Sequence, residues 1–211
     1  NEGKELGYTN EGGYNNTIRY LTNIIGLWLI QETRRELKGK GQNVSFAEMA
    51  ERAEKCEALK CIIDPGDPSF TKPGDMIVRV KDYLKKTNQY VPETDNEIFR
   101  CIYESLALKY KDALLKLEKL TGKKYNRIHM VGGGINAKLL CKFTADACGV
   151  EVVAGPVEAT AMGNIAVQFI ALGDIKDVNE AREIIAASEE SCVYKPENTE
   201  MWNEAYNRFY K

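Results

Sequence analysis

Three consecutive glycines, Gly132, Gly133 and Gly134, are the part of the sequence with the clearest chemical meaning. They follow a short β-prone run, 127–131, and precede a segment of helical character that begins at Ala137. A glycine backbone carries no Cβ, so a ligand can approach it closely. The first N–H groups of a helix are unpaired and its dipole is positive there, so this junction suits a phosphate or another polar ligand. The alternative is a tight turn that binds nothing.

The same residues also fit a dinucleotide-binding fingerprint, because Gly132, Gly134 and Ala137 match the pattern G-x-G-x-x-G/A. That fingerprint needs an acidic residue near the end of the second strand, where it holds a ribose hydroxyl. The second predicted strand, 150–153, has its acid, Glu151, at its start. Too few strands follow for a complete dinucleotide-binding fold, so a dinucleotide-dependent oxidoreductase is disfavoured.

The segments around these glycines alternate between strand and helix. Residues 126–173 are predicted to form a strand, a helix, a strand and a helix, the last opened by Gly155 and Pro156 and ended by Gly173. Strands that are joined through a helix in one sheet are normally parallel. This part of the chain is therefore predicted to be an α/β unit with parallel strands.

The part before this unit, 17–122, is predicted to be mainly helical. A loop or hairpin over residues 1–16, rich in glycine and asparagine, precedes it. Apolar residues at three- and four-residue steps then predict a first helix from Ile18 that includes Trp28 and ends at Gly39.

Two capping boxes predict further helix starts. Ser45 is followed by Glu48, and Thr94 is followed by Glu97, with Gly122 as the stop of the second and longest helix. The remaining predicted helices cover 46–59, 73–86 and, within a helical tail over 176–211, 177–187 and 199 onward. The chain 1–211 is therefore predicted to be a single α/β domain with a small mixed sheet and a large helical part.

Composition excludes several classes of protein. Hydrophobic residues make up 44% of the 211 residues and charged residues 28%, which is typical of a folded globular protein. A net charge of −2 gives no broad attraction for nucleic acid. No apolar run approaches the roughly 20 residues that a membrane helix needs. We therefore expect neither a nucleic-acid nor a membrane partner.

The six cysteines form no CxxC pair, and the single histidine, His129, cannot complete a zinc site with cysteines spaced in this way. We interpret them as small core hydrophobes in a reducing compartment, which predicts a cytoplasmic protein. The chain also shows no paired carboxylates at catalytic spacing, so neither a metal site nor a catalytic residue is predicted in it.

Three ordered motifs resemble the C-terminal signature of the FGGY carbohydrate kinases. They are Gly132-Gly133-Gly134-Ile135-Asn136, then Thr144-Ala145-Asp146-Ala147-Cys148-Gly149-Val150, then Gly155-Pro156-Val157-Glu158-Ala159-Thr160-Ala161 with Gly163-Asn164. The resemblance implies the actin-like ATPase superfold, in which two ribonuclease-H-like domains close on nucleotide and substrate. This chain would be the C-terminal, nucleotide-side domain.

Within that family, the N-terminal part is similar to rhamnulokinases, in Thr9-Asn10-Glu11-Gly12-Gly13, in 21–31 and in Cys61-Ile62-Ile63-Asp64-Pro65. The resemblance implies that Asn23 contacts the sugar, and that Gln31 and Gly133, with Gly132 and Gly134 beside it, contact ATP. On one predicted helix, Asn23 and Gln31 would lie about 80° apart.

The implied activity is transfer of the γ-phosphate of ATP, with Mg²⁺, to a ketose, most closely L-rhamnulose to L-rhamnulose 1-phosphate. By the resemblance, the catalytic Asp and the first phosphate loop lie upstream of Thr9. The chain also lacks an initiator Met, so we expect it to be cut from a longer protein, to need its N-terminal domain and to be inactive alone. Exposed sheet edges or apolar surface would then favour self-association. The alternatives are a non-catalytic nucleotide- or protein-binding module, or a kinase for another ketose or pentulose.

Overall fold

A computed structural model of the chain describes residues 2–210. The helices are α1 (Glu2–Glu5), α2 (Trp28–Gly39), α3 (Phe46–Glu54), α4 (Met76–Lys86), α5 (Asp95–Thr121), α6 (Lys138–Cys148), α7 (Ala159–Leu172), α8 (Val178–Ser188) and α9 (Thr199–Tyr210). The strands are β1 (Thr9–Gly12), β2 (Ile18–Leu21), β3 (Arg127–Met130), β4 (Glu151–Ala154) and β5 (Cys192–Tyr194). A 3-10 turn covers Gly133–Asn136. No helix within the described residues is both long and apolar enough to cross a membrane.

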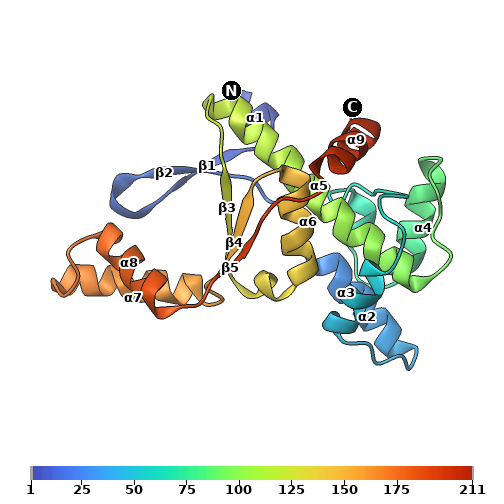
Figure 1. Cartoon of the computed structure of the whole chain (residues 1–211), viewed down its shortest axis with the longest axis horizontal. Helices are drawn as coiled ribbons and strands as arrows, with labels where there is room; N and C mark the ends of the chain where they lie inside the picture. Colours follow the sequence, from blue (N-terminus) through green and yellow to red (C-terminus); the bar gives the residue numbers. More distant parts are fainter. Residues whose placement is uncertain (1, 211) are drawn as a thin grey trace.

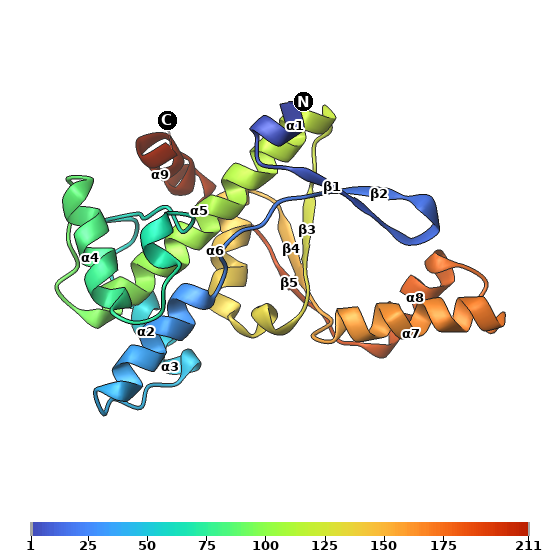
Figure 2. The same ribbon diagram turned by 180° about the vertical axis from the view of Figure 1, so that it is seen from behind.

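The strands form two separate sheets. β1 and β2 make an antiparallel hairpin, whereas β3, β4 and β5 make a three-stranded sheet with β4 in the middle. β3 and β4 are parallel, as predicted, with Ile128 opposite Val152. α2 to α6 and α9 form the main helical body on one side of this sheet, whereas the hairpin and the α7–α8 pair extend away from it (Figures 1 and 2).

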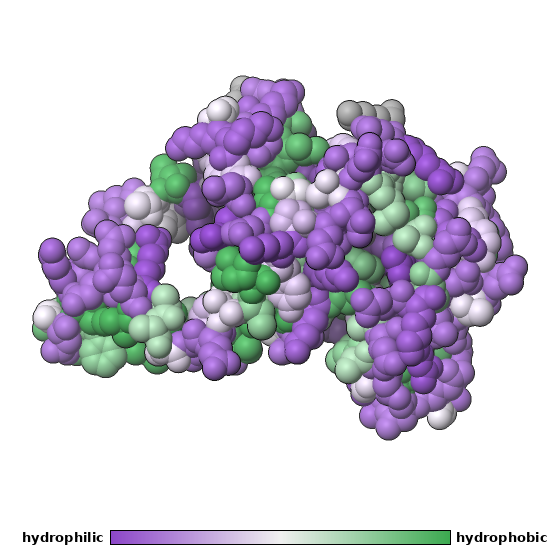
Figure 3. Space-filling model, viewed as in Figure 1, coloured by the Kyte–Doolittle hydropathy of each residue, from purple (hydrophilic) through white to green (hydrophobic). Residues whose placement is uncertain are grey.

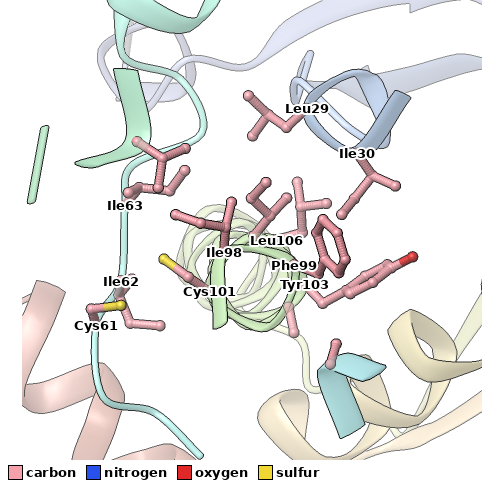
Figure 4. Close-up of a cluster of buried hydrophobic side chains, with 14 of the residues drawn as sticks. Leu29, Ile30, Cys61, Ile62, Ile63, Ile98, Phe99, Cys101, Tyr103 and Leu106 are labelled. Carbon is pink, nitrogen blue, oxygen red and sulfur yellow. The ribbon is translucent and has the colours of Figure 1, made fainter. Parts of the chain in front are cut away.

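The core surrounds α5. Its first half is buried on every side, from Ile98 to Leu108, because α2, α3, α4 and the segment 59–63 pack around it. Figure 4 shows Leu29 and Ile30 of α2 on one side of this helix and Ile63 on another. α6 packs along the same helix and, through Cys141 and Ala145, covers Val152 and Ala154 of β4. The core therefore fixes α6, and with it the glycine turn that precedes α6.

Both capping boxes are confirmed. The Ser45 hydroxyl accepts from the N–H of Glu48, whose carboxylate accepts from the N–H of Ser45. Thr94 and Glu97 repeat this exchange at the start of α5. Gly122 ends α5 in the left-handed conformation, as predicted, where a side chain would be strained.

The helix predicted from Ile18 is wrong over its first part. Residues Ile18–Leu21 form β2, and the helix begins only at Trp28. The hairpin pairing explains the difference, because β1 satisfies the backbone of β2 and an Arg19–Glu11 ion pair of 2.9 Å links the two strands. Apolar residues at helical spacing thus lie in two different elements, and tertiary pairing overrides the pattern.

Further boundaries differ from the prediction, and α3 ends at Glu54 and not at residue 59. α7 starts at Ala159 and α4 at Met76, so Pro156 and Pro73 precede their helices and do not lie in the first turn. β5 replaces part of the loop that we expected before Thr199.

The cysteines are buried only in part. Cys61, Cys101 and Cys141 are buried and Cys192 is exposed, so the interpretation of the cysteines as core residues holds for only some of them.

The α5 capping box allows a test of stability against pH. Burial alone would raise the pKa of Glu97, but hydrogen bonds from the Thr94 N–H, the Tyr90 hydroxyl and the Glu93 N–H, with Lys60 nearby, lower it to about 2, below its ordinary 4.5. The ionised carboxylate therefore stabilises the fold above pH 4.5, and this contribution is lost as the pH falls toward 2.

We expect Glu97→Ala to lower the free energy of unfolding by about 1–2 kcal/mol at pH 7. The difference from wild type should shrink as the pH falls from 4.5 toward 2. Urea unfolding across this pH range measures it. A difference that does not change with pH would contradict the assigned role of the charge.

Candidate nucleotide-binding site

The glycine turn lies beside the turn that follows the neighbouring strand. The N–H of Gly132 donates to the carbonyl of Pro156 at 3.0 Å, and the N–H of Gly155 donates to the carbonyl of Met130 at 2.9 Å. Gly155 must be glycine, since its φ is +140° and a Cβ there would lie 3.2 Å from the Glu190 carbonyl oxygen. The two glycine-containing motifs of the sequence therefore form one structure at the carboxyl ends of the parallel strands.

The turn after β3 presents open backbone. Gly132 has a φ of +81°, and Gly133 begins the 3-10 turn with no atom within 4 Å of the position that a Cβ would occupy. Ala137 precedes α6 without a side-chain cap, so the first N–H groups of this helix receive no side-chain acceptor from the cap position. Backbone donors and a positive helix end thus lie together.

A cavity of about 540 Å³ opens beside this turn. The side chains come from α2, α3, α5 and the start of α6, and most of them are apolar. The lining residues are Leu27, Ile30, Gln31, Phe46, Ala47, Ala50, Tyr103, Gly133, Asn136, Ala137, Lys138 and Leu139. Such a mainly apolar cleft with a few polar groups is typical of small-molecule sites.

The polar groups of the cavity favour an anion. Its lining includes the basic residue Lys138 and the amides Gln31 and Asn136 and, within the described residues, no aspartate or glutamate. Burial raises the pKa of the Tyr103 phenol to about 12, so this hydroxyl stays neutral and can donate a hydrogen bond. Across residues 2–210, no cluster of three or more His, Cys, Asp or Glu side chains is placed to hold a metal ion.

Comparison with known sequences decides the family. A sequence model described as the FGGY family of carbohydrate kinases, C-terminal domain, matches residues 1–172. The chain belongs to this family. The rhamnulokinase of Enterococcus faecalis is 47% identical over 190 residues, which cover 89% of this chain and 38% of that protein. The rhamnulokinase of Bacteroides thetaiotaomicron is 40% identical over 208 residues, or 99% of this chain and 42% of its own length. The chain thus spans about two fifths of these relatives.

Solved structures agree on the fold. Xylulose kinase from Lactobacillus acidophilus matches with a TM-score of 0.69 at 17% identity. The matched region covers 96% of this chain and 41% of the xylulose kinase chain. Plasmodium falciparum glycerol kinase with ADP matches with a TM-score of 0.63 at 16% identity. The matched region covers 96% of this chain and 42% of the glycerol kinase chain. The predicted fold class is confirmed: an actin-like α/β domain of the FGGY kinases, with small sheets and many helices.

The structure brings together two of the residues named from the family resemblance. Gln31 of α2 and Gly133 line the same cavity, although they are far apart in the sequence. Gly132 and Gly134 belong to the same turn, but they do not line the cavity. Asn23 lies exposed in the loop between β2 and α2, outside the lining residues and not on the helix of Gln31 as predicted.

Sequence reasoning missed the wall that α3 contributes to this FGGY domain. Phe46, Ala47 and Ala50 line the cavity, and Phe46 is 46% exposed. The guanidinium of Arg34 lies 4.8 Å from the centroid of the Phe46 ring. An aromatic residue directly after the N-cap Ser45, at the solvent-facing start of a helix, is the signal that could have indicated this wall.

Proposed function

We propose that this chain is the nucleotide-side half of an ATP-dependent carbohydrate kinase, with the cavity beside Gly133 as the site of the adenosine group. The observation that carries the proposal is the meeting of Gln31 and Gly133 in one apolar cavity of a domain of the FGGY family. Both residues come from motifs that resemble the ATP contacts of that family.

The residues present fit such a ligand. A volume of about 540 Å³ lies within the usual range of ligand pockets, roughly 300–1,000 Å³. Phe46, Ala47 and Ala50 offer an apolar wall to a purine ring, and Lys138 with the start of α6 favours the negative phosphates. When bound, ATP supplies the phosphoryl group and Mg²⁺ neutralises its charge. The chain's own part is to hold the nucleoside end and keep water from it.

The relatives support a choice of sugar. The curated rhamnulokinases are 39–47% identical to this chain, so the proposed reaction converts L-rhamnulose to L-rhamnulose 1-phosphate. Asn23 is the proposed sugar contact on this side. It lies exposed in the loop that ends at Leu27, a lining residue of the cavity, so the proposed sugar contact is close in the sequence to the proposed nucleotide site.

The other half of the machinery is assigned to an N-terminal domain. The chain spans 38–42% of the relatives' length, and the proposal assigns the catalytic base and the phosphate loop to polypeptide outside residues 1–211. The isolated chain would therefore transfer no phosphate. The buried thiols of Cys61, Cys101 and Cys141 are compatible with a reducing compartment, and the cytoplasm is the proposed location.

A coupled assay of ADP formation tests the proposal. The full-length protein is incubated with Mg-ATP and, in turn, L-rhamnulose, xylulose, ribulose and glycerol, with the 1–211 chain as the control. We expect turnover with L-rhamnulose in the full-length protein alone. Turnover with another ketose would change the substrate, and ADP binding without turnover on any sugar would indicate a non-catalytic module.

A further inference from the structure

Phe46, the first residue of α3, is an aromatic side chain that the core does not account for. Met49 and Ala53 follow it on the same face of the helix, and both are buried. Phe46 itself is 46% exposed and lines the cavity beside Gly133. The surface over α2 and α3 is mostly hydrophilic (Figure 3), so an exposed phenyl ring stands out there. The apolar face of α3 thus continues past the core and reaches the cavity.

Arg34 of α2 contacts one side of this ring. Its Cζ lies 4.8 Å from the centroid of the Phe46 ring, which is within the range of a cation–π contact. The Nε of Arg34 donates to the carbonyl of Val44 at 2.7 Å, so the guanidinium is tied to the backbone just before α3. Arg34 is not one of the residues that line the cavity. The guanidinium therefore contacts the ring from outside the cavity and leaves the cavity side of the ring free.

The backbone on both sides of the cavity wall is also fixed. The capping box of Ser45 and Glu48 holds the first turn of α3, from which Phe46 projects. Gln31 precedes Arg34 by three residues on α2, so the two side chains are neighbours on that helix. One lines the cavity and the other lies on the Phe46 ring. A flat ring held in place beside an amide side chain suits a flat ligand with polar edges.

We propose that the ring of Phe46 stacks on the base of the bound nucleotide, and that Arg34 is the positioning residue that holds the ring for this contact. The two fused rings of a purine cover more of a phenyl ring than the single ring of a pyrimidine, so stacking on Phe46 makes the site selective for purine nucleotides. This inference deepens the proposed function and rests on it, because it takes the ligand of the cavity to be a nucleotide.

Calorimetric titration of the full-length protein with Mg-ADP, and with Mg-CDP in competition as the pyrimidine probe, tests the stacking. Phe46→Ala should weaken ADP binding about 10- to 100-fold and CDP binding less, so that the preference for ADP falls. Phe46→Tyr keeps the ring and should bind ADP like the wild type. Phe46→Leu keeps apolar bulk without the ring and should lose about fivefold or more. Val78→Ala on α4 is the control, since Val78 is 51% exposed outside the cavity, and it should change neither affinity.

A double-mutant cycle tests the role of Arg34. Arg34→Met should weaken ADP binding about threefold, because the ring loses its cation–π partner. In the Phe46→Ala background the same substitution should have no effect, since Arg34 acts through the ring. Turnover gives a second readout: Phe46→Ala should raise KM for ATP and leave kcat unchanged, because the base is remote from the phosphoryl group that is transferred.

The outcomes separate this inference from the proposed function. If the wild type binds ADP and Phe46→Ala and Phe46→Leu bind it equally well, the stacking is wrong and the nucleotide site stands. Equal losses of ADP and CDP affinity, together with a lower melting temperature in Phe46→Ala, would assign Phe46 to the fold and also overturn the stacking. A wild-type protein that binds no ADP would remove the proposed function, and this inference with it.

Discussion

Glu104→Ala is expected to lower the free energy of unfolding by about 3–5 kcal/mol, the usual cost of breaking a buried ion pair. Glu104 of α5 is 1% exposed and accepts from the Nε of Arg100 at 2.7 Å. Both of its oxygens also accept from the N–H of Leu59, at 3.0 and 2.9 Å. Removing the carboxylate leaves a buried guanidinium without its counter-charge and a buried N–H without an acceptor.

The loss of stability should also affect α3, because Arg100 donates hydrogen bonds to the last turn of α3 and to the residues after it. Its Nη1 contacts the carbonyls of Ala53, Glu54 and Cys56 at 3.3, 3.0 and 3.0 Å. α3 carries the Phe46 wall of the nucleotide cavity, so this ion pair connects the core to the site.

Urea unfolding at pH 8 measures the effect. Burial raises the pKa of Glu104 to about 7, although Arg100 opposes this, so the carboxyl is ionised at that pH. Glu51→Ala is the control, since Glu51 forms an exposed pair with Lys55, and it should change little. The double variant Arg100→Met, Glu104→Leu should be more stable than Glu104→Ala, because no unpaired charge remains. A double variant as unstable as the single one would contradict the electrostatic cause.

Gly133→Val is expected to weaken binding of Mg-ADP to the full-length protein about 10- to 100-fold, because overpacking a fitted site costs about 1–3 kcal/mol. The backbone of Gly133 does not need glycine, since its φ is not positive, and a Cβ meets no atom within 4 Å. The new methyl groups would therefore project into space that the ligand needs, with little strain in the fold.

Gly39→Val is the matched control for this prediction. Gly39 ends α2, a Cβ there also meets nothing within 4 Å, and the residue lies outside the cavity. It should leave ADP affinity unchanged. Equal ADP affinity in wild type, Gly133→Val and Gly39→Val would exclude close approach of the nucleotide to Gly133. A melting temperature that falls only in Gly133→Val would indicate that Gly133 has a structural role.

Local signals in the sequence predicted much of this fold. The capping boxes at Ser45 and Thr94 and the stop at Gly122 act within one helical turn, so short sequence patterns contain the information. The parallel pairing of β3 and β4 followed from the helix between them. β2 and the three-residue β5 could not be found in this way, because their pairing partners decide their conformation.

The site was predicted only where a motif marked it. Gly133 and Gln31 were named from the resemblance, and the structure places them in one cavity. Phe46 carries no motif of its own, and its position beside Gly133 depends on how α3 and α6 both pack on α5. A contact between residues so far apart in the sequence follows from the tertiary fold and cannot be read from local periodicity.

Calorimetric titration of the full-length protein with Mg-ADP, with NADH as the second ligand, tests the central claim most directly. The account predicts saturable binding of ADP and none of NADH. Binding of NADH would contradict it, because the turn at Gly132 to Ala137 would then be the dinucleotide fingerprint that the position of Glu151 disfavours. Absence of ADP binding would equally contradict a nucleotide site beside Gly133.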